Sequence, residues 1–144
     1  MTTIHSAPTR AVPAETLYAL MRLRQDVFVL EQECLYPDLD GRDLEPGARL
    51  YWAEQGDGTV VGTLRVLAEP GGGVRVGRVA TASSARGSGV AAALVRAVLE
   101  ASTGPVVLDA QSHLEGWYAR LGFERDGAEF LDDGIPHVPM RLDR

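Results

Sequence analysis

The stretch Arg86-Gly87-Ser88-Gly89-Val90-Ala91 stands where a strand pattern gives way to a helix pattern. Before it, residues 74–80 alternate as a β-strand does. After it, apolar residues recur at helical spacing and predict one face of a helix, formed by Val90, Ala91, Leu94, Val95, Val98 and Leu99. This part of the chain is therefore predicted to be a strand, a glycine-rich turn and a helix, with one parallel crossover in the sheet.

The turn has the features of an anion-binding site. The first amides of a helix have no intrahelical acceptor, and the helix dipole places about half a positive charge at that end. Gly87 and Gly89 would let a phosphate approach those amides without meeting a β-carbon. Two glycines before a helix also form tight turns that bind nothing, so this spacing alone leaves both interpretations open.

Two well-known phosphate-binding motifs do not fit this stretch. A Walker loop requires a Lys after its last glycine, and the chain contains no Lys at all. A Rossmann fingerprint requires a third glycine, which is missing, although Asp109 lies near the distance expected for its acidic residue. These departures favour a nucleotide-type anion other than a nucleoside triphosphate.

Length, composition and charge bound the class of protein. The chain has 144 residues, of which 45% are hydrophobic and 24% charged, and this predicts one globular domain over residues 1–144. It shows neither a stretch of membrane-spanning length nor a signal-peptide pattern, so we expect no membrane partner. The net charge of -6 argues against a nucleic-acid partner. Cys34 is the only cysteine, which excludes an internal disulfide and favours a cytoplasmic protein.

Hydrophobic periodicity predicts the remaining elements. A helix would begin at Pro13, with apolar positions at Leu17, Leu20, Leu23, Val27 and Leu30. Another helix is expected over residues 113–121, with Gly122 as its C-terminal cap. Strands are expected over residues 2–5, 50–54, 59–67, 105–110, 123–130 and 137–142.

This order predicts an α+β fold, a mixed α/β arrangement of three layers. We expect a central, mostly antiparallel mixed sheet of about six to seven strands, with helices on both faces. A free sheet edge in such a small domain would also allow a homodimer.

Two motifs together resemble the GNAT acetyltransferases. Arg86-x-x-Gly89-x-Ala91 resembles the acetyl-CoA pyrophosphate signature of that family. Strand 106–110 and the helix residues 117–123, which end in Tyr118-x-x-x-Gly122-Phe123, resemble its second motif. Residues 28–36 with Asp38, Asp40 and Asp43, and residues 133–137, resemble the ElaA-like branch, so the resemblance covers nearly the whole chain. It implies a fold of the acyl-CoA N-acyltransferase type.

The resemblance also implies an activity. An acetyl group would pass from acetyl-CoA to a primary amine of a small cationic molecule or peptide, by direct attack in a ternary complex and with no metal. The pantetheine arm would bind main-chain groups of Val79, Ala80 and Thr81. The pyrophosphate would bind the loop formed by Arg86, Gly87, Ser88, Gly89, Val90 and Ala91. Many relatives have an Asn before the last helix that contacts pantetheine, and here Gln111 is the candidate for that contact.

The resemblance makes Tyr118 the general acid that protonates the departing thiolate. A phenol has a pKa of about 10, so it is a neutral donor at pH 7. A thiolate with a thiol pKa of about 8.5 is already a fair leaving group, so we expect a gain of about 10²-fold. The alternative is that Tyr118 is a core aromatic residue packed beside Trp117 and Phe123.

The acceptor amine requires a proton acceptor. An alkylamine has a pKa of about 10.4, so removing its proton at pH 7 costs about 4.6 kcal/mol. The candidate bases are Glu31, Glu33, Asp109, His113 and His137. Glu31 is preferred because it leaves the first helix beside an acidic segment, and His137, after the rigid Ile135-Pro136, is second. A solvated acid and a structural histidine are the respective alternatives.

The segment from residue 31 to residue 45 carries six acidic residues against one basic residue, Arg42. We interpret it as the lip of the acceptor site, where it would attract a cationic amine. The expected acceptor-binding residues are Glu31, Gln32, Tyr36, Asp38 and His137. A solvated loop whose aspartates cap turns is the alternative, and a calcium loop is disfavoured because Gly41 is misplaced.

The sequence is consistent with three functions. The first is an amine N-acetyltransferase, and the second is an acyl-CoA-binding regulatory domain with little catalytic activity. The third is an unrelated α/β domain whose glycine loop binds another anion. Binding of acetyl-CoA separates the third from the other two, and release of CoA with amines separates the first from the second.

Overall fold

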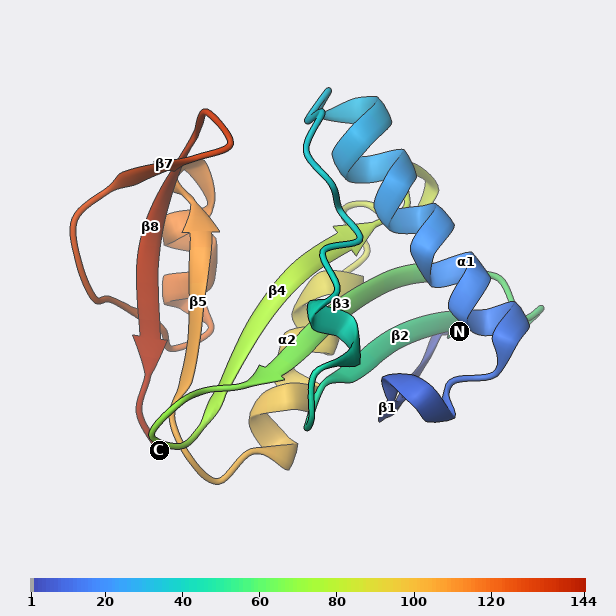
Figure 1. The fold of residues 1–144 in the computed structure, drawn as a ribbon, viewed down its shortest axis with the longest axis horizontal. Helices are drawn as coiled ribbons and strands as arrows, with labels where there is room; N and C mark the ends of the chain where they lie inside the picture. The colour runs from blue at the N-terminus through green and yellow to red at the C-terminus, as the bar shows by residue number, and fades with distance from the viewer. Residues whose placement is uncertain (1) are drawn as a thin grey trace.

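The three-dimensional structure is a computed structural model that describes residues 2–144. Eight strands form one sheet in the order β1-β2-β3-β4-β5-β8-β6, and β7 pairs with β8 (Figure 1). The strands are β1 (Thr2–Pro8), β2 (Arg49–Gln55), β3 (Val60–Ala68), β4 (Val74–Thr81), β5 (Val106–Gln111), β6 (Glu124–Arg125), β7 (Phe130–Asp132) and β8 (Ile135–Leu142). Only β4 and β5 pair in parallel among the described strands, so the mostly antiparallel mixed sheet is confirmed, with eight strands instead of six or seven.

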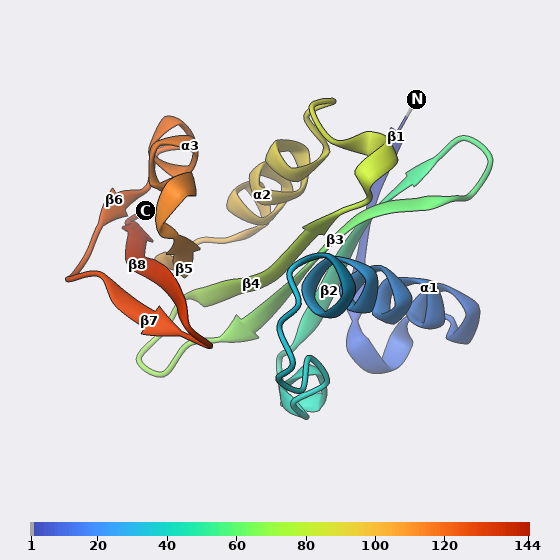
Figure 2. The same ribbon diagram turned by 90° about the horizontal axis from the view of Figure 1, so that it is seen from above.

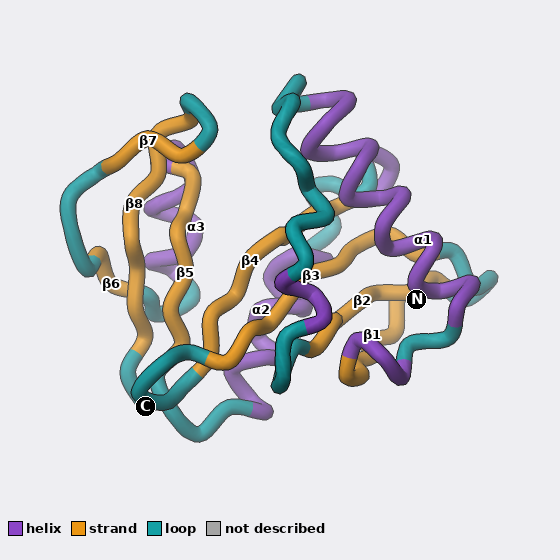
Figure 3. Tube along the Cα trace, viewed as in Figure 1, coloured by secondary structure: helices purple, strands orange, loops and turns teal. Residues whose placement is uncertain are grey.

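Three α-helices cover the sheet on its two faces. They are α1 (Ala14–Arg24), α2 (Val90–Ala101) and α3 (Glu115–Arg120). Figure 2 shows α1 on one face and α2 and α3 on the other. Figure 3 marks the helices, strands and loops along the Cα trace. The three layers expected from the sequence are therefore present.

The apolar core fills both interfaces between helices and sheet. The larger cluster lies between the sheet and α2 and α3, and includes Leu64, Val76, Leu94, Val106 and Met140. A second cluster lies under α1 and is formed by Val12, Leu20, Leu50 and Trp52. Because both faces of the central strands are covered, β3 is buried along almost its whole length rather than at alternate residues.

The first helix changes its winding after Arg24. Residues Gln25–Glu31 form a π-helical segment, η2, and the Gln32 amide donates to the Val27 carbonyl at 3.1 Å, five residues back. The wider turn moves the following residues out of the apolar stripe, so Val27 is buried but Leu30 is 63% exposed. The prediction that Leu30 continues the buried face was wrong, because the 3.6-residue period stops where the π-helical segment starts.

The C-terminal region also differs from the prediction. Residues 123–130 do not form one strand but contribute the short β6 and the start of β7. At this point β8 contains Pro139, which has no amide to donate, and a β-carbon on Gly127 would lie 2.8 Å from its Cγ. The predicted helix 113–121 is instead a 3₁₀ turn, Ser112–Leu114, followed by α3.

Strands β4 and β5 pair over three residues each and then diverge (Figure 1). The pairs join Val74–Val76 to Val106–Leu108. Beyond them, the register between β4 and β3 shifts, and Arg78 has a positive φ of 52°. An irregularity of this kind bends a strand and increases its twist, so β4 leaves β5 and the far halves of the two strands no longer pair with each other.

The close packing of α2 on β3 depends on Gly62. A β-carbon at this position would lie 2.5 Å from Val90 Cγ1 and 3.1 Å from Leu94 Cδ1. We expect Gly62→Ala to lower the free energy of unfolding by about 1–3 kcal/mol in urea denaturation, because the added methyl group overpacks this interface. Gly56→Ala is the control, since nothing lies within 4 Å of a β-carbon there. Equal stability of the two variants would contradict this view of the interface.

Candidate active site

Two cavities meet where β4 and β5 diverge. The front cavity, on the α1 side, has a volume of about 420 Å³ and is lined by the segment after η2, by β3, β4 and β5, and by the β7–β8 turn. The rear cavity has a volume of about 580 Å³ and is lined by the end of β4, the turn before α2, the start of α2 and α3. Both volumes suit small ligands. Val79, Leu114 and Tyr118 line both cavities, so these residues form the junction between them.

The start of α2 presents free amides to the rear cavity. Gly89 is the N-cap residue, no side chain caps this helix, and the Ala93 amide makes a bond of 3.0 Å to the Gly89 carbonyl. The amides of residues 90–92 therefore have no intrahelical acceptor. Gly87 and Gly89 have φ of 79° and 84°, and added β-carbons would meet nothing within 4 Å. Backbone conformation, rather than crowding, is thus what requires glycine here.

The side chains of the turn point in different directions. Ser88 donates its hydroxyl to the Ala85 carbonyl and does not cap α2. Arg86 lines the rear cavity and donates from Nη2 to Glu31 Oε1 at 2.7 Å and to the Thr81 carbonyl at 3.1 Å. The hydrogen bond from Arg86 lowers the pKa of Glu31, which makes this carboxylate a weaker base. Glu31 lines neither cavity.

Tyr118 is a packed residue that also reaches the junction of the cavities. Its ring makes edge contacts with Trp117 and Phe123, at centroid distances of 4.8 Å and 5.9 Å. The side chain is 6% exposed, and its burial raises the pKa of the hydroxyl to about 12. Tyr118 is therefore a neutral hydrogen-bond donor over the whole physiological range of pH. Its packing beside Trp117 and Phe123 matches the alternative interpretation, and its role as a general acid stays a prediction.

An ion network fixes the acidic segment to the sheet under the front cavity. Its members are three arginines and three aspartates, namely Arg24, Arg65, Arg78, Asp38, Asp40 and Asp43. Arg24 is 1% exposed and donates from Nε to Asp38 at 2.8 Å and from Nη1 to Asp43 at 2.7 Å. Its charge is thus compensated by two carboxylates inside the protein, as a buried arginine requires.

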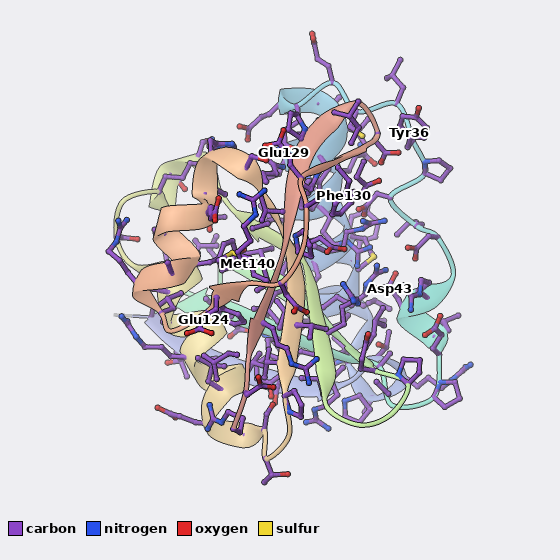
Figure 4. All side chains as sticks on the ribbon, turned by 90° about the vertical axis from the view of Figure 1, so that its left-hand side faces the viewer. Tyr36, Asp43, Glu124, Glu129, Phe130 and Met140 are labelled. Atoms are coloured by element: carbon purple, nitrogen blue, oxygen red, sulfur yellow. The ribbon has the colours of Figure 1, made fainter. Side chains whose placement is uncertain are left out.

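The other two arginines complete the network from β3 and β4. Arg65 donates to Asp40 at 2.8 Å, and Arg78 Nη2 donates to the same carboxylate at 3.2 Å. Burial opposes ionisation of Asp40, but the hydrogen bonds from Arg65 and from the Arg42 amide prevail and lower its pKa. In Figure 4, Asp43 lies where the acidic loop meets the strands. These aspartates therefore carry compensated charge and do not form an open anionic lip.

Other carboxylates remain at the mouth of the front cavity. Asp132 and Asp133 line it from the β7–β8 turn, and neither pairs with an arginine of the described residues. Asp133 accepts a weak hydrogen bond of 3.7 Å from Cys34. The attraction of a cationic amine stays a prediction, and these two aspartates are the groups that would produce it. The part of the chain that the structure describes contains no cluster of three metal-ligating side chains.

The expected acceptor residues other than Glu31 lie around the front cavity. Gln32, Tyr36, Asp38 and His137 all line it. Gln111, expected to contact pantetheine, also lines this cavity, and its amide donates to Gln32 at 3.4 Å. Figure 4 shows Tyr36 and Phe130 toward the same end of the molecule, on the acidic loop and on β7. The acidic loop, with Tyr36, and the β7–β8 turn, with Asp132 and Asp133, are far apart in the sequence but line the same cavity.

The expected bases separate into three groups. Asp109 and His137 line the front cavity, His113 lines the rear cavity, and Glu31 and Glu33 line neither. Asp109 accepts a hydrogen bond of 3.1 Å from Arg75, which also binds Glu69. His137 Nδ1 lies 2.7 Å from the Ile135 carbonyl oxygen, and its ring stacks on Phe130 at 5.9 Å.

The arginines that shape the front cavity were not among the site residues predicted from the sequence. Arg24 stands within a helix and Arg65 within the strongly apolar run of β3. A charged residue at a buried position requires an opposite charge nearby. An arginine within an apolar helix or strand was therefore a signal that carboxylates of the acidic segment pair with it. Hydrophobic periodicity does not show which aspartate pairs with which arginine.

The fold is of the acyl-CoA N-acyltransferase type, and comparison with known families agrees. The pattern described as "Acetyltransferase (GNAT) domain" matches residues 24–144. The chain belongs to the GNAT acetyltransferase family.

Relatives place it in the ElaA-like branch, as the motifs predicted. A UPF0039 protein of Mycobacterium tuberculosis is 52% identical over 131 residues, which cover 88% of this chain and 84% of the relative. Protein ElaA of Escherichia coli is 39% identical over 134 residues, covering 86% and 85%.

Solved structures confirm the fold class. An acyl-CoA N-acyltransferase from Pseudomonas aeruginosa superposes with a TM-score of 0.91 at 36% identity, over 99% of both chains. Escherichia coli ElaA superposes with a TM-score of 0.90 at 33% identity, over 99% of this chain and all of that one. In residues 2–144, no helix has the length and apolar character needed to traverse a bilayer.

The ion network makes a prediction about stability. Asp43→Ala would leave Arg24 and Arg65 without one of their buried partners, so we expect the free energy of unfolding to fall by about 3–5 kcal/mol. Glu45→Ala is the matched control, since it removes only the exposed pair with Arg42 and should cost about 0–1 kcal/mol. Urea denaturation of both variants gives the comparison. A loss at Asp43 no greater than that at Glu45 would show that the network does not anchor the loop.

Proposed function

We propose that the protein is a single-domain N-acetyltransferase that transfers the acetyl group of acetyl-CoA to a primary amine. The acceptor would be a small cationic molecule or a peptide, and the amine would attack the thioester directly in a ternary complex. The observation that carries this proposal is the position of Tyr118, which lines both cavities. A donor in the rear cavity and an acceptor in the front cavity would meet beside this residue.

The rear cavity suits the donor. Its free amides at the start of α2 can receive the pyrophosphate, and the helix dipole favours the negative charge there. Beyond Val76, β4 is no longer paired with β5, so main-chain groups on that edge, in the stretch from Val79 to Thr81, can bond to the amides of pantetheine. Since the Gln111 side chain lines the front cavity, we assign it to the acceptor side.

Tyr118 acts in this proposal as a relay rather than as a strong acid. Its pKa of about 12 exceeds that of a thiol by about 3.5 units, so full proton transfer to the thiolate alone would cost about 5 kcal/mol. After attack, however, the nitrogen must lose a proton and the sulfur must gain one. A hydroxyl between the two cavities can give its proton to sulfur as it takes one from nitrogen, and no phenolate accumulates.

Two measurements test the proposed function. Titration calorimetry with acetyl-CoA should show binding, and CoA release should be detected with at least one member of a panel of polyamines, amino sugars, amino acids and peptide N-termini. Binding of acetyl-CoA without CoA release from any amine would support a regulatory acyl-CoA-binding domain instead. Absence of acetyl-CoA binding would contradict both.

Tyr118→Phe tests the role of the hydroxyl. We expect kcat to fall by about 10²-fold, with little change in the KM for acetyl-CoA, because Phe keeps the ring contacts and removes only the donor. Tyr18→Phe is the matched control, because Tyr18 is 74% exposed on α1 and its loss of a hydroxyl should change nothing. Unchanged turnover of Tyr118→Phe would remove Tyr118 from the mechanism.

A further inference from the structure

We propose that His137 is the catalytic base that takes the proton from the acceptor amine. This inference rests on the proposed function and names the residue that activates the acceptor in the front cavity. His137 and Tyr118 both line that cavity, so one residue would act on the nitrogen and the other on the sulfur of the same reaction.

The hydrogen bonds of His137 define its tautomer. Nδ1 lies 2.7 Å from the carbonyl oxygen of Ile135, and a carbonyl can only accept. Nδ1 must therefore carry the hydrogen, which leaves the lone pair of the neutral imidazole on Nε2. Nε2 has no hydrogen-bond partner among the described residues. A histidine held in this way can accept a proton without first breaking a bond.

The surroundings hold the ring in place. Phe130 stacks on the imidazole with an interplanar angle of 27°, and β7 and β5 flank the strand through the pairs Phe130–His137 and Gln111–His137. Pro136 restricts the backbone just before it. A base that is fixed by strands on both sides meets the requirement for positioning better than a base on an exposed loop.

The other candidates are occupied or misplaced. Asp109 shares the front cavity but is bound by Arg75 at 3.1 Å. Glu31 is bound by Arg86 at 2.7 Å, and neither Glu31 nor Glu33 lines a cavity. His113 lines the rear cavity, where the donor would bind. Asp132 and Asp133, at the turn before His137, can attract the ammonium group to the mouth.

With His137 as the base, the protons and electron pairs of the reaction balance. The ammonium group gives one proton to Nε2, and its freed lone pair forms the N–C bond to the thioester carbonyl carbon. When the C–S bond breaks, its electron pair goes to sulfur, which receives a proton through Tyr118 while the nitrogen loses its second proton. The products are the acetamide, CoA with a free thiol, and an imidazolium that returns its proton to water.

Two substitutions at His137 separate catalysis from structure. His137→Asn places an amide N–H near the position of Nδ1, so it can keep the bond to the Ile135 carbonyl but has no Nε2. We expect kcat to fall by about 10²–10⁴-fold, with acetyl-CoA affinity and thermal midpoint close to those of the wild type. In His137→Ala, added imidazole should restore part of the turnover. His5→Asn is the control, because His5 lies on the edge strand β1, stacked on Trp52.

The outcomes distinguish the two levels of the proposal. Wild-type turnover with an equally active His137→Asn would overturn the assignment of the base and leave the proposed function intact. If His137→Asn keeps its turnover while His137→Ala loses it and imidazole does not restore it, His137 has a structural role. This result would also overturn the assignment of the base. If the wild type itself releases no CoA with any amine, the proposed function fails, and the base assignment fails with it.

Discussion

The bulge in β4 is the constraint on which the two cavities depend. At Arg78 the backbone takes a positive φ and the register with β3 shifts, so β4 turns away from β5 after three paired residues. The same Arg78 carries an ion pair of 2.8 Å to Asp38. One residue thus bends the strand and binds the loop that closes the front cavity. Without the divergence, β4 and β5 would stay hydrogen-bonded and no junction could form beside Tyr118.

The ion network explains why so acidic a loop lies against the protein. A buried arginine is costly unless carboxylates compensate it, and each of the three arginines here meets two aspartates. The resulting geometry ties a segment with little regular structure to α1, β3 and β4. The aspartates of this loop therefore mostly neutralise arginines of the fold and are not free to attract a substrate. Asp132 and Asp133, whose carboxylates pair with no arginine of the described residues, lie on the β7–β8 turn.

The proposed donor side could be predicted from local sequence, but the proposed acceptor side could not. The free amides at the start of α2 come from consecutive residues, so the glycines before that helix indicate them without knowledge of the rest of the chain. The front cavity instead combines Tyr36 from a loop, Arg65 from β3 and His137 from β8. Glu31 was preferred as a base because it leaves the first helix beside the acidic segment. This position in the sequence does not show that its carboxylate pairs with Arg86 in the folded chain.

Local sequence determined the layers, the crossover from β4 through α2 to β5 and the motifs of the family, because periodicity and turn chemistry act over a few neighbouring residues. It did not determine the π-helical turn that exposes Leu30, the partners of the buried arginines or the free nitrogen of His137. These were decided by tertiary structure, since each depends on which groups from distant segments compete for the same space, charge or hydrogen bond.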